Sequence, residues 1–224
     1  MEEKKEKKEK SVWNNYTAEE KQELFQLNES YKAFLSQCKT ERESTEEIVR
    51  QAELKGYRNL QDIIKNGESL KAGDKVYATC MKKAVAMFNI GSRNLEEGMS
   101  ILGAHIDTCR LDLKQKPLYE ADGMAYFDTH YYGGIKKYQW VTLPLALHGV
   151  VVKKDGTVVK IVVGENEDDP VFCVTDLLIH RSQKQMEKKA TVVVEGEDLD
   201  ILIGSHPLEG EEKDAVKAAI LKLL

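Results

Sequence analysis

The chain is organised around residues 103–113, which read Gly-Ala-His-Ile-Asp-Thr-Cys-Arg-Leu-Asp-Leu. The residues before them, Met99 to Leu102, form a short apolar run that predicts a buried strand. In an extended chain, residues two apart project from the same face. We therefore expect His105 and Asp107 to emerge together at the end of this strand, close enough to act on one ligand.

This pair of side chains suits a metal ion. A ligating imidazole must be neutral, and it is usually held in one tautomer by donating its other N–H to a carboxylate or a carbonyl. Asp107 could accept that hydrogen bond or bind the metal itself. The competing interpretation is a polar strand end without a ligand, because a His-x-Asp pattern is short and common.

The composition bounds the class of protein. The 224 residues are enough for one large domain or two small domains with hydrophobic cores. The net charge of −5 argues against general nucleic-acid binding, which requires a basic surface. No apolar run approaches the roughly 18 residues of a membrane span, and the charged N-terminus lacks the apolar segment of a secretory signal. We therefore expect no nucleic-acid partner, no membrane partner and a cytoplasmic location.

The four cysteines, Cys38, Cys80, Cys109 and Cys173, include no Cys-x-x-Cys pair. This spacing predicts neither a zinc ribbon nor a disulfide framework, and reduced thiols are expected in a cytosolic protein. Cys109 adjoins the candidate metal strand, but no local feature marks its thiol as an activated nucleophile.

Two helices are predicted ahead of the central stretch. The first begins at Thr17, which forms a capping box with Glu20. An apolar stripe follows at steps of three and four residues: Leu24, Leu27, Tyr31, Phe34 and Cys38. Ser44 and Glu47 repeat the capping signature for a second helix, which should end at the Lys55-Gly56 pair.

Strands are predicted on both sides of the central stretch. A hairpin is expected from residues 75–78 and 84–90, and another from 141–152 and 157–163 with its turn at 153–156. The acidic segment 165–170 is expected to be a solvated turn. Two more strands (191–194 and 199–203) and a final helix (211–223) complete the prediction.

These elements suggest a division of the chain near residue 110. Residues 1–16, rich in alternating charges, are predicted to be disordered or a frayed helix. Residues 17–110 mix helices with strands, and residues 111–224 are rich in β-structure, so the fold class is α/β.

Three separated segments carry a resemblance to a known family. They are Ile-Leu-Gly-Ala-His-Ile-Asp with Arg-Leu-Asp-Leu-Lys (101–114), Tyr-Tyr-Gly-Gly (131–134) and Val-Thr-Asp-Leu-Leu-Ile-His (174–180). In this order they resemble the aspartyl aminopeptidase family, the zinc peptidases related to yeast vacuolar aminopeptidase I. The resemblance runs from about Ser11 to the end of the chain.

The resemblance implies an assignment for each part of the chain. Residues 17–110 would be the first part of an α/β zinc-peptidase catalytic domain, and residues 111–224 an inserted β-rich dimerisation domain. His105 would bind one of two zinc ions per active site, and Asp107 would support it in the catalytic centre. His180, by its own context an ordinary histidine at a strand end, would contact substrate in a partner's active site.

The resemblance also implies an activity and an assembly. Members of this family remove an N-terminal residue, usually an acidic one, from peptides. Their dimers build a larger shell, so we expect a homo-oligomer that acts on peptide substrates.

The remaining parts of a two-zinc site are not recognisable in this sequence. The family also uses a bridging Asp, a Glu-Glu pair, a further carboxylate and a late His, and no Glu-Glu pair here follows a buried strand. Because catalytic zinc generally needs about three protein ligands, we expect the chain to be roughly the first half of a longer peptidase and inactive alone. The alternative is a non-catalytic oligomerisation or regulatory module derived from such a peptidase.

Overall fold

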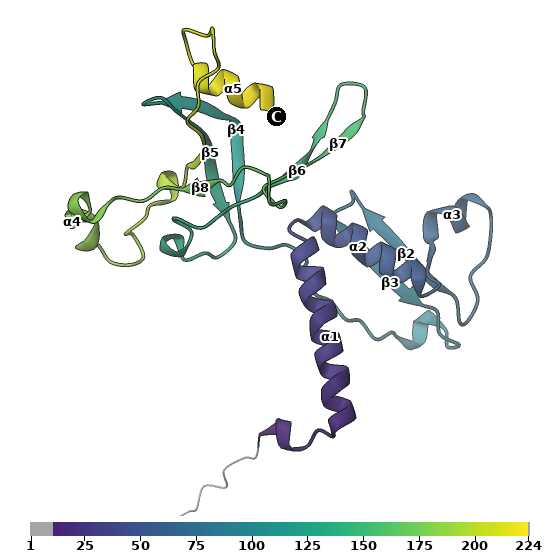
Figure 1. Ribbon diagram of the computed structural model, residues 1–224. Helices are drawn as coiled ribbons and strands as arrows, with labels where there is room; N and C mark the ends of the chain where they lie inside the picture. Colours follow the sequence, from purple (N-terminus) through teal and green to yellow (C-terminus); the bar gives the residue numbers. More distant parts are fainter. Residues whose placement is uncertain (1–10, 224) are drawn as a thin grey trace, which may run out of the picture. The chain divides into compact units, whose positions relative to one another are not determined.

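The computed structural model describes residues 11–223, and the chain divides between Ile106 and Asp107 into two compact units (Figure 1). Each unit has its own sheet and its own buried core. Within residues 11–223, no helix has both the length and the apolar character that crossing a bilayer requires. The disorder expected for residues 1–16 falls mostly on residues 1–10, which lie outside the described residues, whereas Val12–Asn14 form a 3-10 helix (η1).

The first unit combines three helices with a small sheet. Its elements after η1 are α1 (Ala18–Gln37), α2 (Glu41–Leu54), β1 (Arg58–Asn59), α3 (Leu60–Lys65), β2 (Lys75–Cys80), β3 (Ala84–Asn89) and the 3-10 helix η2 (Leu95–Glu97). The predicted start of α1 is confirmed, because the Thr17 hydroxyl accepts the N–H of Glu20 and the Glu20 carboxylate accepts the N–H of Thr17. The apolar stripe is buried only at Cys38, just after the helix, and no residue within α1 is buried.

The start predicted for α2 is wrong by one turn. The capping box is formed by Thr40 and Glu43, so Ser44 and Glu47 lie inside the helix, where both are buried. A Thr-x-x-Glu pair satisfies the same free N–H groups as a Ser-x-x-Glu pair, and the earlier pair nucleates the helix. The predicted end is confirmed: Gly56 follows the helix with a φ of +84°, which closes its last turn.

The sheet of the first unit has the order β1-β2-β3, with β1 parallel to β2 and β2 antiparallel to β3. The β2–β3 hairpin and its connection at residues 81–83 were predicted and are confirmed. α2 packs on this hairpin (Figure 1). The buried hydrophobic residues of the unit are Cys38, Ala52, Ile63, Val76 and Tyr77.

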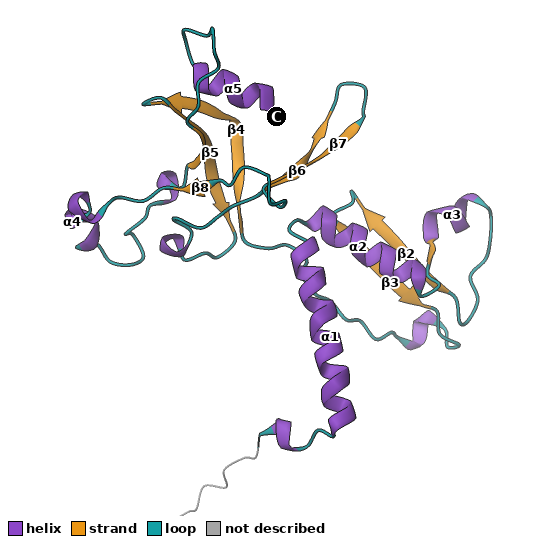
Figure 2. Cartoon of the chain, viewed as in Figure 1, coloured by secondary structure: helices purple, strands orange, loops and turns teal. Residues whose placement is uncertain are grey.

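The strand predicted for residues 99–107 is not formed. The segment has no regular secondary structure and runs as a loop towards the second unit (Figure 2). Ile101 is 79% exposed and Leu102 is fully exposed. A strand exists only when a neighbouring strand accepts its backbone hydrogen bonds, and among the described residues none pairs with this segment.

The second unit is built on a four-stranded antiparallel sheet of order β4-β5-β9-β8. Its strands are β4 (Arg110–Ala121), β5 (Met124–Tyr132), β8 (Cys173–Val174) and β9 (Ile201–Gly204). The long β4–β5 hairpin was not predicted. Its turn is the pair Asp122-Gly123, with φ values of +51° and +73°. Asp-Gly between two alternating segments is a strong hairpin signal, and it marks this turn in the sequence.

A separate two-stranded ribbon is formed by β6 (Leu147–Val152) and β7 (Val158–Val163). The hairpin and its turn were predicted, but the first strand was expected from residue 141, where Val141 and Leu145 make only isolated bridges. The strand predicted for residues 191–194 is wrong, although Val194 is buried in the core. Short helical turns connect the strands: η3 (Lys137–Gln139), η4 (Ile179–Arg181), α4 (Gln183–Met186) and η5 (Gly196–Asp198).

The core of the second unit lies between the sheet and helix α5 (Ala215–Leu223). Val216 and Ile220 on α5 pack with a cluster that includes Ala125, Phe127 and the fully buried Leu199. The helix begins four residues later than predicted, because Asp214 has a φ of +50°, outside the helical range.

Glu47 carries a buried charge on α2. Its carboxylate accepts hydrogen bonds from Arg50 Nε at 2.7 Å, Arg50 Nη2 at 2.6 Å and Gln51 Nε2 at 2.8 Å. These bonds favour the ionised form and lower the pKa of Glu47 from 4.5 to about 2. Between about pH 2 and pH 4.5, the Glu47 carboxylate is therefore mostly ionised in the folded protein and mostly protonated in the unfolded chain.

We predict a pH-dependent loss of stability that arises from Glu47. A carboxyl whose pKa is lowered by folding stabilises the protein above its unfolded pKa, and this stabilisation is lost as the pH falls from about 4.5 to about 2. In the Glu47→Gln variant, the thermal midpoint should be lower at pH 7 and should fall less between pH 7 and pH 3. The control is Glu46→Gln, because Glu46 is exposed on the same helix. Identical pH profiles for the Glu47 variant and the unmodified chain would contradict the prediction.

Candidate functional site

Two of the motifs singled out in the sequence meet on the β4–β5 ladder. Arg110 pairs with Tyr132, Leu111 with Tyr131, and Asp112 with His130. The end of the central stretch therefore lies beside the Tyr-Tyr-Gly-Gly segment at 131–134. Because β4 and β5 are adjacent strands of one sheet, the position of these side chains is fixed by backbone hydrogen bonds.

Asp107 is held by a side chain of this ladder. The Tyr132 hydroxyl donates a hydrogen bond to Asp107 Oδ2 at 3.0 Å. The Arg110 guanidinium carbon lies 4.1 Å from the centre of the Tyr132 ring, a cation–π contact. Arg110 also donates from Nε to Asp112 Oδ1 at 2.7 Å. The partly buried Asp107 carboxylate is thus oriented by a tyrosine that is itself fixed by an ion-paired arginine.

Gly133 allows the two segments to approach closely. Its φ is +82°, and a Cβ at this position would lie 3.1 Å from Cys109 Sγ. The Cys109 thiol contacts the carbonyl oxygen of Gly134 at 3.5 Å. A glycine is therefore required here by both the backbone conformation and the available space. Cys109 belongs to this packing contact.

His105 and Asp107 fall on opposite sides of the division between the units. His105 lies exposed within the loop that runs from η2 to β4, and the strand that was expected to present both side chains on one face is not formed. Within the part of the chain that the structure describes, no three His, Cys, Asp or Glu side chains are grouped so that they could hold a metal ion. These residues therefore do not by themselves fit a complete zinc site, which needs about three protein ligands.

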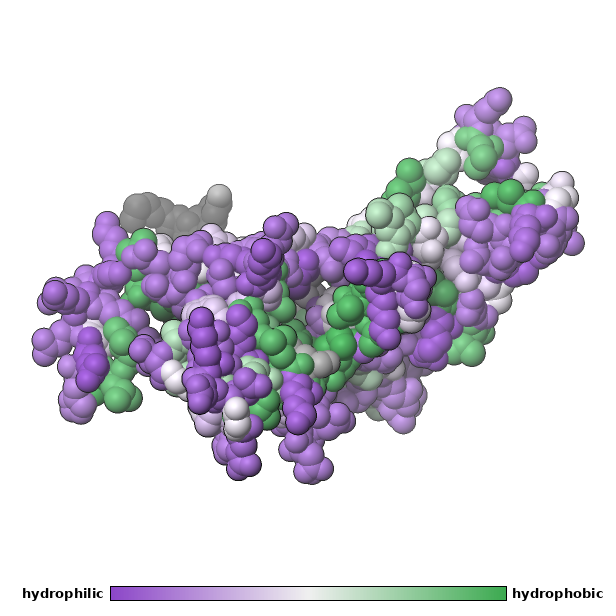
Figure 3. Space-filling model, turned by 90° about the horizontal axis from the view of Figure 1, so that it is seen from above, coloured by the Kyte–Doolittle hydropathy of each residue, from purple (hydrophilic) through white to green (hydrophobic). Residues whose placement is uncertain are grey.

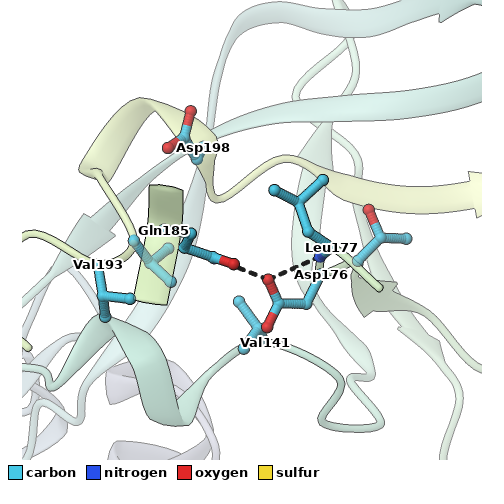
Figure 4. A pocket seen from close by; sticks show the side chains of 8 residues that line it. Val141, Asp176, Leu177, Gln185, Val193 and Asp198 are labelled. Carbon is cyan, nitrogen blue, oxygen red and sulfur yellow. Dashed lines mark hydrogen bonds between the residues drawn. The ribbon is translucent and has the colours of Figure 1, made fainter. Parts of the chain in front are cut away.

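His180 lies in the turn η4, after β8, and its side chain is exposed. It is not at the end of a strand, as its sequence context alone had suggested. Asp176 fastens the segment that leads to this turn: its Oδ1 accepts the N–H of Leu177 at 2.8 Å and Nε2 of Gln185 at 2.9 Å (Figure 4). The segment is therefore tied to α4 while His180 faces solvent.

A pocket of about 320 Å³ adjoins this segment. Asp176, Leu177 and Gln185 line one part of it, and Val141, Val193 and Asp198 are among the other lining residues (Figure 4). Within this pocket, Oδ1 of Asp176 already accepts hydrogen bonds from Gln185 and from the Leu177 N–H.

Sequence reasoning missed the contact between Tyr132 and Asp107 and the contact of Arg110 with the Tyr132 ring. Arg110 and Tyr132 were both part of quoted motifs, but neither was assigned a contact. The Asp122-Gly123 turn was the available signal, because a two-residue turn fixes the register of the strands that it joins. Counted back from the turn, the strands pair from Ala121 with Met124 to Leu118 with Phe127. The irregularity between Leu113 and Leu118 then shifts the pairing, so that Arg110 lies opposite Tyr132.

Comparison with known proteins gives consistent results. The family model described as "Aminopeptidase I zinc metalloprotease (M18)" matches residues 34–224. A probable M18 family aminopeptidase 1 from Clostridium acetobutylicum is 58% identical over 216 residues, which cover 96% of this chain and 46% of that protein. The chain therefore spans about half the length of this curated relative.

The solved structures agree with this match. The crystal structure of an M18 aminopeptidase from Thermotoga maritima aligns with a TM-score of 0.86 at 40% identity, covering 96% of this chain and 45% of the other. The S. cerevisiae mApe1 dodecamer aligns with a TM-score of 0.59 at 18% identity, covering 82% of this chain and 39% of the other, a likeness of fold alone. The expected α/β class is confirmed. Since the family model matches most of its residues, this chain belongs to the M18 family of aminopeptidases.

Proposed function

We propose that this chain is part of a zinc-dependent aminopeptidase that removes N-terminal residues, with acidic residues preferred, from peptides. The observation that carries the proposal is the family match over residues 34–224, together with the 58% identity to the Clostridium acetobutylicum relative. The activity is that of the complete protein, because this chain spans only about half of that relative's length.

His105 is proposed as a ligand of one of two zinc ions, with Asp107 supporting it. An outer carboxylate fixes the tautomer and the orientation of a ligating imidazole. The hydrogen bond from Tyr132 to Asp107 supports this role, because it holds the carboxylate in place before any metal binds. The other ligands are proposed to come from residues beyond this chain, since the described residues contain no group of three.

His180 is proposed to contact substrate in the active site of a second subunit. Its turn is exposed, and the preceding Leu178 and Ile179 are 73% and 68% exposed. Large apolar side chains on a protruding turn are typical of a surface that meets another protein. A histidine N–H near the scissile carbonyl would stabilise the negative charge that develops there.

Self-association is proposed as the state in which the enzyme works, in the cytoplasm. A trans-acting His180 requires a second subunit, and the related yeast protein is described as a dodecamer. Exposed apolar side chains occur on the surface of this chain between hydrophilic ones (Figure 3).

We predict that the 224-residue chain has no aminopeptidase activity when loaded with zinc, because too few ligands are grouped to hold a catalytic ion. The measurement is hydrolysis of aspartyl and leucyl p-nitroanilides in the presence of zinc. The full-length Clostridium acetobutylicum relative, in the same assay, is the positive control. Turnover by the purified chain above that of a zinc-only blank would refute the prediction.

In the complete gene product, His105→Ala is expected to remove at least one zinc ion per subunit and to abolish activity, because a first ligand is lost. Asp107→Asn should weaken zinc binding about 10- to 100-fold, the usual cost of losing an outer-sphere carboxylate. Zinc content by mass spectrometry and competition with a chelator measure these effects, and His206→Ala is the control. Unchanged zinc content and activity in His105→Ala would remove the basis of the peptidase proposal.

His180→Ala in the complete gene product should lower kcat by about 10²- to 10³-fold, as expected for loss of an oxyanion donor, with zinc content unchanged. Because the histidine acts on the neighbouring subunit, mixing this variant with His105→Ala during refolding should restore measurable activity. If the mixture is no more active than its two components, His180 does not act across subunits.

A further inference from the structure

The pocket beside the segment that leads to His180 has an apolar floor and an acidic rim (Figure 4). Its floor is formed by Val141, Val193 and Val194, of which Val194 is buried in the core and the other two pack against that core. Its rim carries the exposed carboxylates of Asp176 and Asp198. A volume of about 320 Å³ falls within the range of small-ligand pockets, which are mostly apolar and fix their ligand with a few polar groups.

The floor is held in place by backbone contacts. Val141 forms a bridge with Val174 of β8, and the N–H of Thr142 donates to the Val174 carbonyl oxygen at 2.7 Å. Val174 is buried in the same core as Val194. The apolar surface is therefore formed before any ligand binds, so binding does not have to order it.

Each carboxylate of the rim has one oxygen that the protein does not use. Asp176 accepts the Leu177 N–H and Gln185 Nε2 through Oδ1, and Asp198 accepts the N–H of Glu195 through Oδ2 at 3.3 Å. Among residues 11–223, no hydrogen bond or ion pair reaches Oδ2 of Asp176 or Oδ1 of Asp198. None of the eight lining residues is basic. The rim therefore offers two acceptor oxygens and negative charge to a ligand.

This combination of groups fits an ammonium on an aliphatic chain. The chain covers the valines of the floor, while the ammonium donates hydrogen bonds to the carboxylates of the rim. A lysine side chain has this chemistry. A calcium ion does not fit the pocket, because it takes six to eight oxygen ligands and the valines supply none.

We propose that this pocket binds the side chain of a lysine in a peptide substrate, downstream of the bond that is cleaved. Leu177 and His180 are three residues apart, so their Cα atoms lie within about 11 Å of each other, which three residues of extended peptide can span. A peptide that contacts His180 therefore reaches the pocket within a few residues. Since an aminopeptidase removes one N-terminal residue, the side chain in the pocket belongs to the remaining part of the peptide. The inference rests on the proposed function and adds a preference for basic downstream residues.

Binding to the 224-residue chain tests the chemistry of the pocket. The probes are Nα-acetyl-lysine N-methylamide and its norleucine counterpart, which has the same aliphatic chain without the ammonium. Both should shift the NMR signals of Val193 and Val194, and the lysine probe should bind about three- to tenfold more tightly at low ionic strength.

Two variants attribute this difference to the rim. Asp176→Asn with Asp198→Asn removes both charges and keeps an acceptor oxygen for the Leu177 N–H, so the two probes should bind equally. Asp168→Asn makes a charge change of the same kind at an exposed residue outside the pocket, and it should leave the difference intact. The NMR spectra also report whether each variant is folded.

Hydrolysis of peptides by the complete gene product tests the role in substrate binding. The peptides begin with aspartate, continue with alanines and carry lysine, norleucine or glutamate at one position from the second to the fifth. At one of these positions, kcat/KM should be about three- to tenfold higher for lysine than for norleucine. The ratio is measured on one enzyme sample, so a general loss of activity cancels. It should fall to about 1 in the variant with both Asn substitutions and remain in Asp168→Asn.

The possible results are distinct. A ratio that is lost only with the rim carboxylates supports the proposal. Equal binding of the two probes, or a ratio that survives both Asn substitutions, overturns it. A preference for glutamate also overturns it, and assigns downstream recognition to the exposed Arg181 and Lys184. If the complete gene product cleaves no peptide, the proposed function fails together with the substrate role, while the NMR experiment still decides whether the pocket binds lysine.

Discussion

The pairing of β4 with β5 is the constraint on which the second unit depends. With Arg110 opposite Tyr132, the tyrosine hydroxyl reaches Asp107 and the tyrosine ring lies against the guanidinium. A slip of one residue would move Tyr132 to the other face of the sheet and leave Asp107 without this donor. The register is held at the far end by the Asp122-Gly123 turn and near the bulge by Lys114, which pairs with Asp128 at 2.8 Å and with Glu197 at 2.6 Å. Asp107 is thus positioned by the sheet, through Tyr132, before any metal or substrate is present.

In the first unit, two segments whose apolar pattern predicts burial are exposed in the structure. α1 has a well-formed capping box and an apolar stripe, yet Leu27 and Tyr31 are 71% and 58% exposed. The segment 99–102 has the composition of a buried strand and is also exposed. The local capping box is enough to form α1, whereas the strand at 99–102 is not formed at all; in both cases burial requires a second layer, which the described residues do not provide. The relatives that match this chain are about twice its length.

Prediction from the sequence succeeded where the deciding interactions are local. The Thr17 capping box, the glycine at the end of α2 and the turns of the β2–β3 and β6–β7 hairpins depend on residues within a few positions of each other. It failed where two equivalent local signals competed, as at Thr40 and Ser44, or where a strand needed a distant partner, as at residues 99–107 and 191–194.

The sequence by itself determined the family, the α/β class and the identity of His105, Asp107 and His180 as the residues of interest, because short motifs in a fixed order carry that information. Only the tertiary structure decided what these residues contact. It showed that the Tyr132 hydroxyl binds Asp107, that His180 lies on an exposed turn and that β6 and β7 form a sheet separate from β4-β5-β9-β8. The physical reason is that strand register and burial depend on contacts between residues far apart in the chain, and no local pattern specifies those contacts.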